Sequence, residues 1–522
     1  MRRLRCALTV AVLVTGSLAC SGADSKYLLK DPAAAQRVDY LILAGDKFAD
    51  HLDVLAAHRE KQGHAVGVVT VSAAKARFTS IRAFLAHAVT RWKKPAPTFL
   101  LLVGDVDAVP AVVKKGALRG WSSSSDLATD FDYARPTGGG VRLHVGRFPC
   151  DTVKELAVMV RKTIAYETEL PAGEWQHKLN LVASVGGYGK QIDSLLEGMA
   201  MAIASSCVPA AYDMQAAYGS PNSPYCPYPP AFNDHVLEMF NRGSLFTLFV
   251  GHGTTRGVAR LYWKRRGYRI FSSGDAKALN VKAGLPILVV IACHTGRYDA
   301  SDCLGETFFK VERGPVAFIG GSRVTQPYGN GLFAKALIDA LFGKAKTLGE
   351  VVTQAKQTVT AHRFSLFRLQ VDTVGGMMQS KESLGPMRKD VVEHYNLLGD
   401  PALVIRRPSP AITLTVTGST AHVSAPGRAK VRLTLECDRL AFLHPIPEID
   451  AKDPRFREKI TDRYRKAHDK IIQRWTVALK DGKGSVEFKL PKKPGRYFLK
   501  ASVSGSVGSA ALTVEPPKPP AP

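Results

Sequence analysis

The chain has 522 residues, of which 45% are hydrophobic and 22% are charged. This length accommodates three or four domains, and the composition excludes a disordered or collagen-like protein. The 71 Lys and Arg residues against 45 Asp and Glu give a formal net charge of +26. Such an excess attracts anionic partners, but it does not distinguish nucleic acid from acidic polysaccharide or an anionic membrane.

Residues 1–20 have the pattern of an export signal. Arg2, Arg3 and Arg5 precede a short apolar run, and small residues then lead to Cys20. The apolar run is too short to span a bilayer as a helix, and no later segment reaches about 18 uninterrupted apolar residues. We therefore expect a signal peptide and export from a bacterial cell. Two forms stay open: a secreted protein, or one anchored to the cell envelope through a lipid on Cys20.

Between residues 37 and 407, apolar strands alternate with helical stretches. PTFLLLV contains a continuous apolar strand of the kind that is buried on both faces of a parallel sheet, and NLVASV, SLFTLFV and PILVVIA are further mostly apolar strands. The alternation predicts an α/β fold with mostly parallel sheets flanked by helices, arranged as two sheet units. We expect one subdomain over residues 37–170 and another over residues 171–407.

After Pro408 the pattern changes to short alternating strands separated by turn residues, which predicts a β-sandwich over residues 408–516. An amphipathic, basic helix is predicted within it, over residues 453–475. We expect this helix to pack its apolar side on the sandwich, and its basic face is a candidate contact for an anionic surface. The α/β part should then fold without the sandwich. Residues 517–522 form a proline-rich tail.

Candidate catalytic residues follow two of the apolar strands. SLFTLFV runs into Gly251, His252 and Gly253, and PILVVIA runs into Cys293 and His294. Because parallel strands end at a common sheet edge, a thiol nucleophile and an imidazole base can meet there. The glycines leave room for a substrate backbone and expose an amide to an oxyanion. Taken alone, a cysteine after an apolar strand is most often a buried structural residue. The histidine motif and the cysteine motif together favour catalysis.

These two motifs, in this order, resemble those of the gingipain-type cysteine peptidases of the caspase-like clan. The likeness extends to FLLLVGDVDAVP, CLGETFF and YNLLGDPAL, and it covers about residues 37–405. It implies a caspase-like fold followed by an immunoglobulin-like sandwich. By position, Cys293 is then the nucleophile, His252 the general acid/base, and the amides of Gly253 and Cys293 the oxyanion hole.

The acid that would orient His252 is less well defined by the resemblance. Asp130 and Asp132 of TDFDYA lie where such an acid is placed, and a capping or turn role is the alternative for either. The resemblance implies a secreted cysteine endopeptidase acting on a protein or peptide substrate. Acyl transfer by a sortase-like transpeptidase and a non-catalytic binding or assembly role stay open. No specific nucleic acid partner is indicated.

No cofactor is expected, because the sequence holds no metal-binding motif, although calcium at loop carboxylates fits a secreted enzyme of this type. Cys207 and Cys226 flank a proline- and tyrosine-rich loop and are the pair that we expect to form a disulfide. His294, beside the nucleophile, either biases the thiolate or is an incidental surface histidine.

The segment ARPTGGGVR bears on specificity. Relatives that cleave after Arg or Lys have an acidic residue in the corresponding segment, and here there is none. A cation in a dry pocket needs a carboxylate beside it. We therefore expect a preference for small, apolar or acidic residues before the cleaved bond. The alternative is that Asp126, Asp130 or Asp132 reaches the pocket from another loop.

Overall fold

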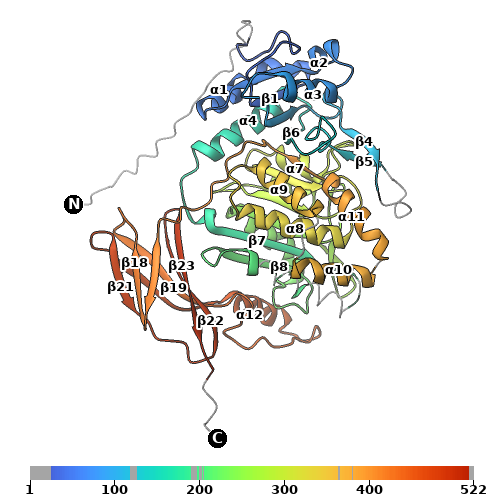
Figure 1. The fold of residues 1–522 in the computed structure, drawn as a ribbon. Helices are drawn as coiled ribbons and strands as arrows, with labels where there is room; N and C mark the ends of the chain where they lie inside the picture. The colour runs from blue at the N-terminus through green and yellow to red at the C-terminus, as the bar shows by residue number, and fades with distance from the viewer. Residues whose placement is uncertain are drawn as a thin grey trace, which may run out of the picture.

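The computed structural model describes residues 25–516, with gaps at 118–125, 188, 190–196, 199–200, 202, 204, 362–364 and 379. The predicted signal peptide over residues 1–20 and the tail over residues 517–522 lie outside the described residues. The described chain forms an α/β unit followed by a C-terminal unit of two smaller antiparallel sheets (Figure 1).

Ten strands form one continuous sheet in the order β2-β1-β3-β6-β16-β15-β14-β9-β7-β8. All neighbouring strands are parallel except β15 and β16. The prediction of a mostly parallel α/β sheet is confirmed. The strands span Tyr40–Ala44 (β1), Val66–Thr70 (β2), Phe99–Val103 (β3), His144–Phe148 (β6), Lys178–Ser184 (β7), Asp213–Gly219 (β8), Phe246–Val250 (β9), Ile287–Ile291 (β14), Ala317–Gly321 (β15) and Tyr395–Leu398 (β16).

The expectation of two sheet units is corrected to one continuous sheet, which has two halves. They meet where β16 pairs with β6 at one residue pair, Leu398 with Arg147. The chain leaves the sheet at once, at Gly399, whose amide still donates to the carbonyl of Arg147 at 2.8 Å. A Cβ atom at Gly146 would lie 2.2 Å from the carbonyl oxygen of Gly399, so the close approach of the halves requires glycine there.

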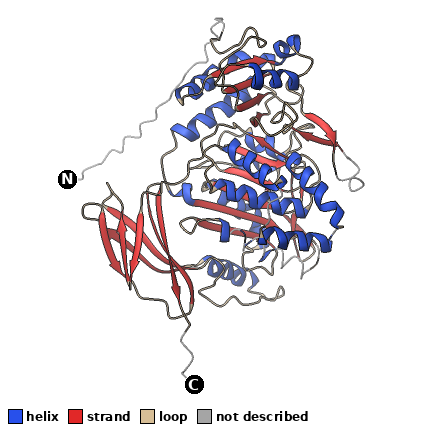
Figure 2. Ribbon diagram, viewed as in Figure 1, coloured by secondary structure: helices blue, strands red, loops and turns tan. Residues whose placement is uncertain are grey.

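Helices cover both faces of the sheet (Figure 2). In β14, Ile287 and Val289 pack in the core that holds α8 and α9, whereas Leu288 and Val290 face the core that holds α6 and α7. Burial on both faces explains why the strand is apolar throughout. The helices span Asp53–Lys61 (α1), Val71–Arg77 (α2), Ile81–Arg91 (α3), Val153–Thr168 (α4), Phe232–Asn241 (α6), Leu304–Phe309 (α7), Pro327–Leu341 (α8), Leu348–Thr360 (α9), Leu366–Met378 (α10) and Lys381–His394 (α11).

Short strands extend from the loops of the α/β unit as three antiparallel pairs. They are β4 (Val112–Lys115) with β5 (Asp126–Thr129), β10 (Gly253–Thr254) with β11 (Gly257–Val258), and β12 (Arg260–Trp263) with β13 (Arg266–Arg269).

The C-terminal unit has a three-stranded sheet, β17-β18-β21, and a four-stranded sheet, β20-β19-β22-β23. Residues of both sheets, among them Leu414, Val423, Leu433 and Leu499, share one apolar core. Its immunoglobulin-like character stays a prediction. The strands span Thr413–Thr417 (β17), Thr420–Ser424 (β18), Lys430–Cys437 (β19), Ile471–Ala478 (β20), Lys483–Glu487 (β21), Gly495–Val503 (β22) and Ser506–Val514 (β23).

The helix α12 (Phe456–His468) lies between β19 and β20 in the sequence, but it packs on the α/β unit beside β8 (Figure 1). Phe456 stacks on Trp263 with ring centroids 4.9 Å apart. Ile460 joins the same core as Phe232 of α6. The expectation that this helix packs its apolar side on the sandwich is therefore wrong. An edge strand such as β8 carries open backbone groups that need a cover, and α12 provides it.

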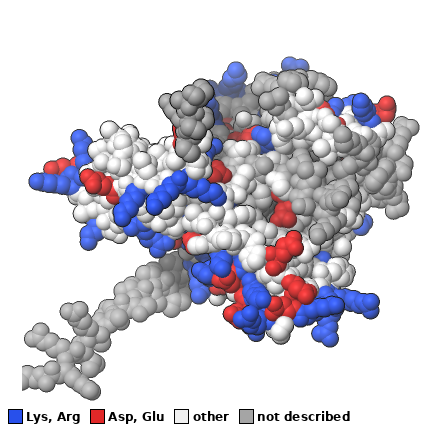
Figure 3. Space-filling model, turned by 90° about the horizontal axis from the view of Figure 1, so that it is seen from below, with Lys and Arg blue, Asp and Glu red and all other residues white. Residues whose placement is uncertain are grey.

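The basic face of α12 is largely paired with acidic residues of the same segment. Lys459 binds Asp453, and both Arg465 and Lys466 bind Asp462. Figure 3 shows this side of the molecule from below, with Lys and Arg interspersed with Asp and Glu rather than gathered in one patch. The contact of the C-terminal unit with an anionic surface stays a prediction.

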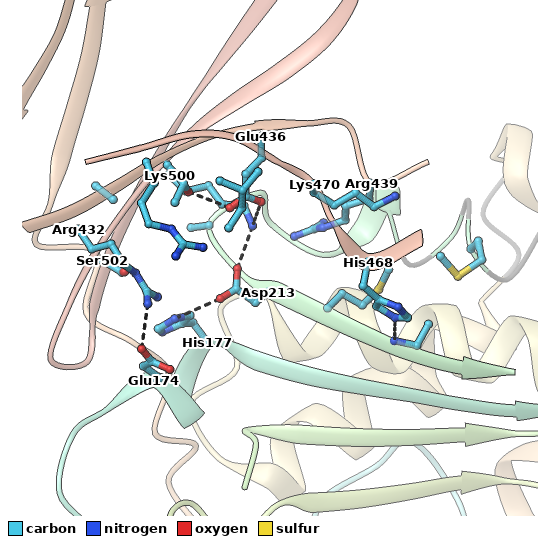
Figure 4. Close-up of a pocket in the computed structure, with 18 of the residues that line it drawn as sticks. Glu174, His177, Asp213, Arg432, Glu436, Arg439, His468, Lys470, Lys500 and Ser502 are labelled. Atoms are coloured by element: carbon cyan, nitrogen blue, oxygen red, sulfur yellow. Dashed lines mark hydrogen bonds and ion pairs between the residues drawn. The ribbon is translucent and has the colours of Figure 1, made fainter. Parts of the chain in front are cut away.

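A polar cavity of about 310 Å³ lies where the C-terminal unit meets the edge of the large sheet (Figure 4). Lys500 of β22 bridges Asp213 of β8, at 2.9 Å, and Glu436 of β19, at 2.7 Å. Arg432 reaches Glu174 at 3.1 Å. Opposite charges from the two units thus pair across the junction, and these contacts hold the C-terminal unit on the sheet.

Candidate active site

The two candidate catalytic motifs lie at neighbouring strand ends. β9 and β14 are parallel, and Val250 pairs with Ile291 at the last position of each strand. His252 comes two residues after the end of β9, and Cys293 comes two residues after the end of β14. Both therefore lie at the same edge of the sheet. The juxtaposition expected from the two apolar strands is present in the fold.

Both glycines beside His252 lie too close to neighbouring residues to carry a side chain. A Cβ atom at Gly253 would lie 2.6 Å from the carbonyl oxygen of Cys293 and 2.7 Å from Cγ2 of Thr295. Gly251 has φ +155°, and a Cβ atom there would lie 2.0 Å from Oγ of Ser184. A larger residue at Gly253 would push the histidine loop away from the cysteine turn, and one at Gly251 would push it away from Ser184 of β7.

The turn after Cys293 is fixed by backbone hydrogen bonds to the chain around the end of β15. The amide of His294 donates to the carbonyl of Arg323 at 3.1 Å, and the amide of Gly296 donates to Gly321 at 2.9 Å. His294 itself has φ +58°, a conformation that side chains other than glycine rarely adopt. Such strain is typical of functional sites, where the surrounding structure holds it in place.

Cys293 is partly exposed, and its sulfur contacts Thr325 in the loop after β15. The amide of Thr325 donates to Sγ at 3.3 Å, and its hydroxyl oxygen lies 3.8 Å from Sγ. Nδ2 of Asn330 donates to this hydroxyl oxygen at 2.9 Å, and the hydroxyl of Tyr395 donates to Oδ1 of Asn330 at 2.8 Å. Burial raises the pKa of Tyr395, so it stays a neutral donor.

Thr325, Asn330 and Tyr395 form a hydrogen-bonded chain behind the nucleophile that the sequence analysis missed. They come from the loop after β15, from α8 and from β16, and none belongs to the two strand-end motifs. No local pattern marks such residues, because only the fold of the sheet brings β16 beside β15.

His252 is held by groups at and just after the end of β7, the strand on the other side of β9. Its Nε2–H donates to the carbonyl of Gly186 at 2.6 Å, and its amide donates to Oγ of Ser184 at 3.4 Å. A carbonyl oxygen only accepts, so the proton of the neutral ring lies on Nε2 and Nδ1 is the nitrogen that can take up a proton.

The two acids proposed to orient His252 are engaged elsewhere. Both carboxylate oxygens of the buried Asp130 accept from Arg147, at 2.8 and 2.7 Å. Asp132 binds Lys114 and Arg135, each at 2.8 Å. These ion pairs give both acids structural roles, and Nε2–H of His252 donates to the backbone carbonyl of Gly186 instead. The prediction of an orienting acid is corrected in this sense.

His294 does not carry a charge that would favour a thiolate. Burial, together with Arg297 and Arg323, lowers the pKa of its ring. Its Nδ1 is buried and has no hydrogen-bond partner among the described residues. The ring is therefore neutral at neutral pH. His294 contributes to the shape of the turn and adds no positive charge beside the thiol.

The other cysteines of the described chain differ from Cys293. Cys207 and Cys226 are free thiols, so the predicted disulfide between them is wrong. Cys226 is fully buried, and its thiol donates to the carbonyl of Pro227 instead. Burial raises the pKa of Cys150 to about 12 and that of Cys303 well above its usual range. Buried thiols of this kind are inert.

No group of three or more His, Cys, Asp or Glu side chains within the described ranges is arranged to hold a metal ion. Calcium stays an untested expectation. None of the helices in the described part of the chain combines the length and the apolar composition that crossing a bilayer requires.

An apolar cavity of about 270 Å³ adjoins the candidate catalytic pair. His252 and Cys293 are part of its lining, and it extends between the sheet and the helices α8 and α10. Of the described residues over 126–142, which the sequence analysis connected with specificity, none lines it.

Comparison with known proteins gives the family of the chain. The sequence model of peptidase family C25 matches residues 33–406. Gingipain R1 of Porphyromonas gingivalis is 22% identical over 346 residues, which cover 65% of this chain and 30% of the relative. Gingipain R2 of the same species is 23% identical over 337 residues, which cover 63% of this chain and 40% of the relative. The chain thus spans less than half the length of these relatives.

Solved structures share the fold. A crystal structure of the Arg-specific cysteine proteinase gingipain R is similar over 93% of this chain and 99% of its own, with a TM-score of 0.54 and 16% identity. A complex of the pro- and mature domains of RgpB from Porphyromonas gingivalis is similar over 91% of this chain, with the same TM-score. Because the family match extends over most of its length, the chain belongs to peptidase family C25, the gingipain-type cysteine peptidases.

Proposed function

We propose that the chain is an exported cysteine endopeptidase with Cys293 as nucleophile and His252 as general acid/base. The observation that carries the proposal is the contact between the two motifs, in which Gly253 packs on the carbonyl of Cys293. Membership of family C25 and the partly exposed thiol also support it. The exported form rests on the sequence of residues 1–20, and the lipid on Cys20 stays one of its two alternatives.

In the first step, Nδ1 of His252 takes the thiol proton and the thiolate of Cys293 attacks the carbonyl carbon of the substrate. The amides of Gly253 and Cys293 are proposed to bind the oxyanion that forms. The amide of Thr325, which donates to Sγ, stabilises negative charge on the sulfur. The carbonyl of Gly186 keeps the other ring nitrogen protonated.

In the second step, the C–N bond breaks and His252 gives its proton to the leaving amine. Water then enters, His252 takes one of its protons, and hydroxide attacks the acyl-enzyme, which releases the acid and the thiol. Transfer to an amine in place of water would make the chain a transpeptidase. No observation at the site favours that reaction over hydrolysis.

Digestion of a diverse peptide mixture in H₂¹⁸O, under reducing conditions, tests the proposal. The chain without residues 1–20 is compared with Cys293→Ala, His252→Ala and the control Cys207→Ala, which removes another partly exposed thiol. We expect ¹⁸O in the new C-termini, a loss of at least about 10³-fold in kcat/KM in the first two variants, and full activity in the control.

Products joined to added amines would indicate a transpeptidase. A folded protein that cleaves nothing in the mixture would favour the binding or assembly role.

A further inference from the structure

We propose that the apolar cavity beside Cys293 receives the side chain of the substrate residue whose carbonyl is attacked, and that it selects a large apolar side chain such as Leu, Met or Phe. The inference rests on the proposed function, because it assigns the substrate class of the same site. It commits to a side chain of the substrate as the occupant of the cavity.

The position of the cavity supports this assignment. Its lining includes His252 and Cys293, so a side chain inside it belongs to a residue held within a few bonds of the reacting carbonyl. From there the cavity runs between the strands of the sheet and two helices. The walls are apolar side chains of β7, β9, β14, α8 and α10, among them Leu181, Leu248, Ile291, Ala334, Ile338 and Val371.

Charge in the cavity does not suit a cationic side chain. Among the lining residues that the structure describes, Glu197 is the one carboxylic acid. It accepts a hydrogen bond from the hydroxyl of Ser223, and burial raises its pKa. Desolvating Arg or Lys without a carboxylate that is free to pair with it is costly.

The carboxylates that the sequence analysis weighed for this role are paired in other places. Asp126 binds Lys115, Asp130 binds Arg147, and Asp132 binds Lys114 and Arg135. The hydroxyl of Tyr328, a polar group of the cavity wall, donates to Asp372 and accepts from Arg388. The cavity is left with an apolar character that fits an apolar side chain.

Matched peptides that differ only at the residue before the cleaved bond test the selection directly. We expect kcat/KM for Leu, Met or Phe to exceed that for Ala by at least about 10-fold, since one methylene in an apolar pocket is worth roughly 10- to 200-fold. We expect an advantage of at least about 100-fold over Arg and Lys. Equal rates for Ala and Leu, or a preference for Arg or Lys, would overturn the proposal.

Gly331 offers a variant that fills the cavity without disturbing the fold. It lies within α8 and lines the cavity, and a Cβ atom there would meet no atom within 4 Å. Gly331→Leu should lower kcat/KM for Leu and Phe peptides by at least about 10-fold and leave Ala peptides within about threefold. The matched control is Gly385→Leu in α11, because Gly385 is also helical and does not line the cavity.

Two further measurements separate the outcomes. Glu197→Gln should keep the preference for apolar residues. If the parent instead prefers Arg and this variant does not, Glu197 is the specificity residue. Cleavage of Ala peptides that is lost in Cys293→Ala, with no effect of Gly331→Leu on any peptide, would refute the cavity assignment while the proposed peptidase activity stands. A chain that cleaves none of the peptides refutes both.

Discussion

The amide of Ala216 donates a hydrogen bond of 3.0 Å to Nε2 of His468, and the carbonyl of Ala216 accepts one of 2.9 Å from the hydroxyl of Tyr464. Ala216 lies in β8, the last strand of the large sheet, and its partners lie in α12. Two side chains of the C-terminal unit therefore hydrogen-bond the backbone of one residue in an edge strand of the α/β unit.

This contact changes the expectation that the α/β unit folds without the C-terminal unit. A chain that ends at Arg407 loses the cover of β8 and the buried side chains of Phe456 and Ile460. Burial of two such side chains contributes about 3 to 6 kcal/mol. We expect the shortened chain to aggregate or to melt well below the full chain, measured by calorimetry. The control is a chain that ends at residue 516. A shortened chain with an unchanged melting temperature would show that α12 only lies on the surface.

His468 makes stability dependent on pH. Burial lowers its pKa to about 4, whereas an unfolded histidine titrates near 6.5. The unfolded chain therefore binds more protons in this window, so His468 stabilises the fold fully above about pH 6.5, and this contribution is lost as pH falls toward 4. We expect it to be on the order of 3 kcal/mol. Urea unfolding of the full chain and of His468→Gln at pH 7 and pH 4.5 measures the difference, and an equal loss of stability in both would contradict it.

Asp130 is expected to act on stability and not on catalysis. Asp130→Asn leaves the fully buried Arg147 without its anion, and breaking such a pair costs about 3 to 5 kcal/mol. Under conditions where the variant is folded, its kcat should stay within about threefold of the parent. Asp132→Asn, at a more exposed pair, should cost less than about 1 kcal/mol. A folded Asp130→Asn whose kcat falls 100-fold would restore Asp130 as a catalytic positioning residue.

Thr325 is expected to hold the nucleophile in position. Its hydroxyl oxygen accepts a hydrogen bond from Asn330 and lies 3.8 Å from Sγ of Cys293. Thr325→Val keeps the shape and the amide but removes this hydroxyl. We expect about a 10-fold lower kcat, an unchanged KM and slower alkylation of Cys293 at pH 7. Thr325→Ser should restore both rates, and a Val variant that matches the parent in both would remove Thr325 from the account.

The sequence predicted the parts of this protein that local patterns encode. Continuous apolar strands such as 287–291 identified the buried sheet, and the residues that end two of these strands identified His252 and Cys293. The join between β6 and β16 could not be predicted, because it depends on one pair, Arg147 with Leu398, some 250 residues apart. Local patterns do not show which distant strand completes a sheet.

The sequence also did not predict which residues individual side chains contact. The pattern around Phe456 showed that the helix has an apolar side, but not which surface that side covers. Nearness in the sequence suggested a bond between Cys207 and Cys226, although the chain directs Cys226 into the core. TDFDYA likewise offered Asp130 to a histidine, and the fold gives it to Arg147.

The most direct test of the account is the rate at which each thiol of the native protein reacts with iodoacetamide, mapped by mass spectrometry. Cys293 is partly exposed beside an amide donor, whereas Cys150, Cys226, Cys303 and Cys437 are buried and burial raises the pKa of each. Cys207, which is also partly exposed, is the matched comparison, and burial raises its pKa. We predict that Cys293 reacts at least about 10-fold faster than Cys207 and that this advantage disappears in His252→Ala. Equal rates for Cys293 and Cys207, or an advantage that survives in His252→Ala, would contradict the assignment of Cys293 and His252 as the catalytic pair.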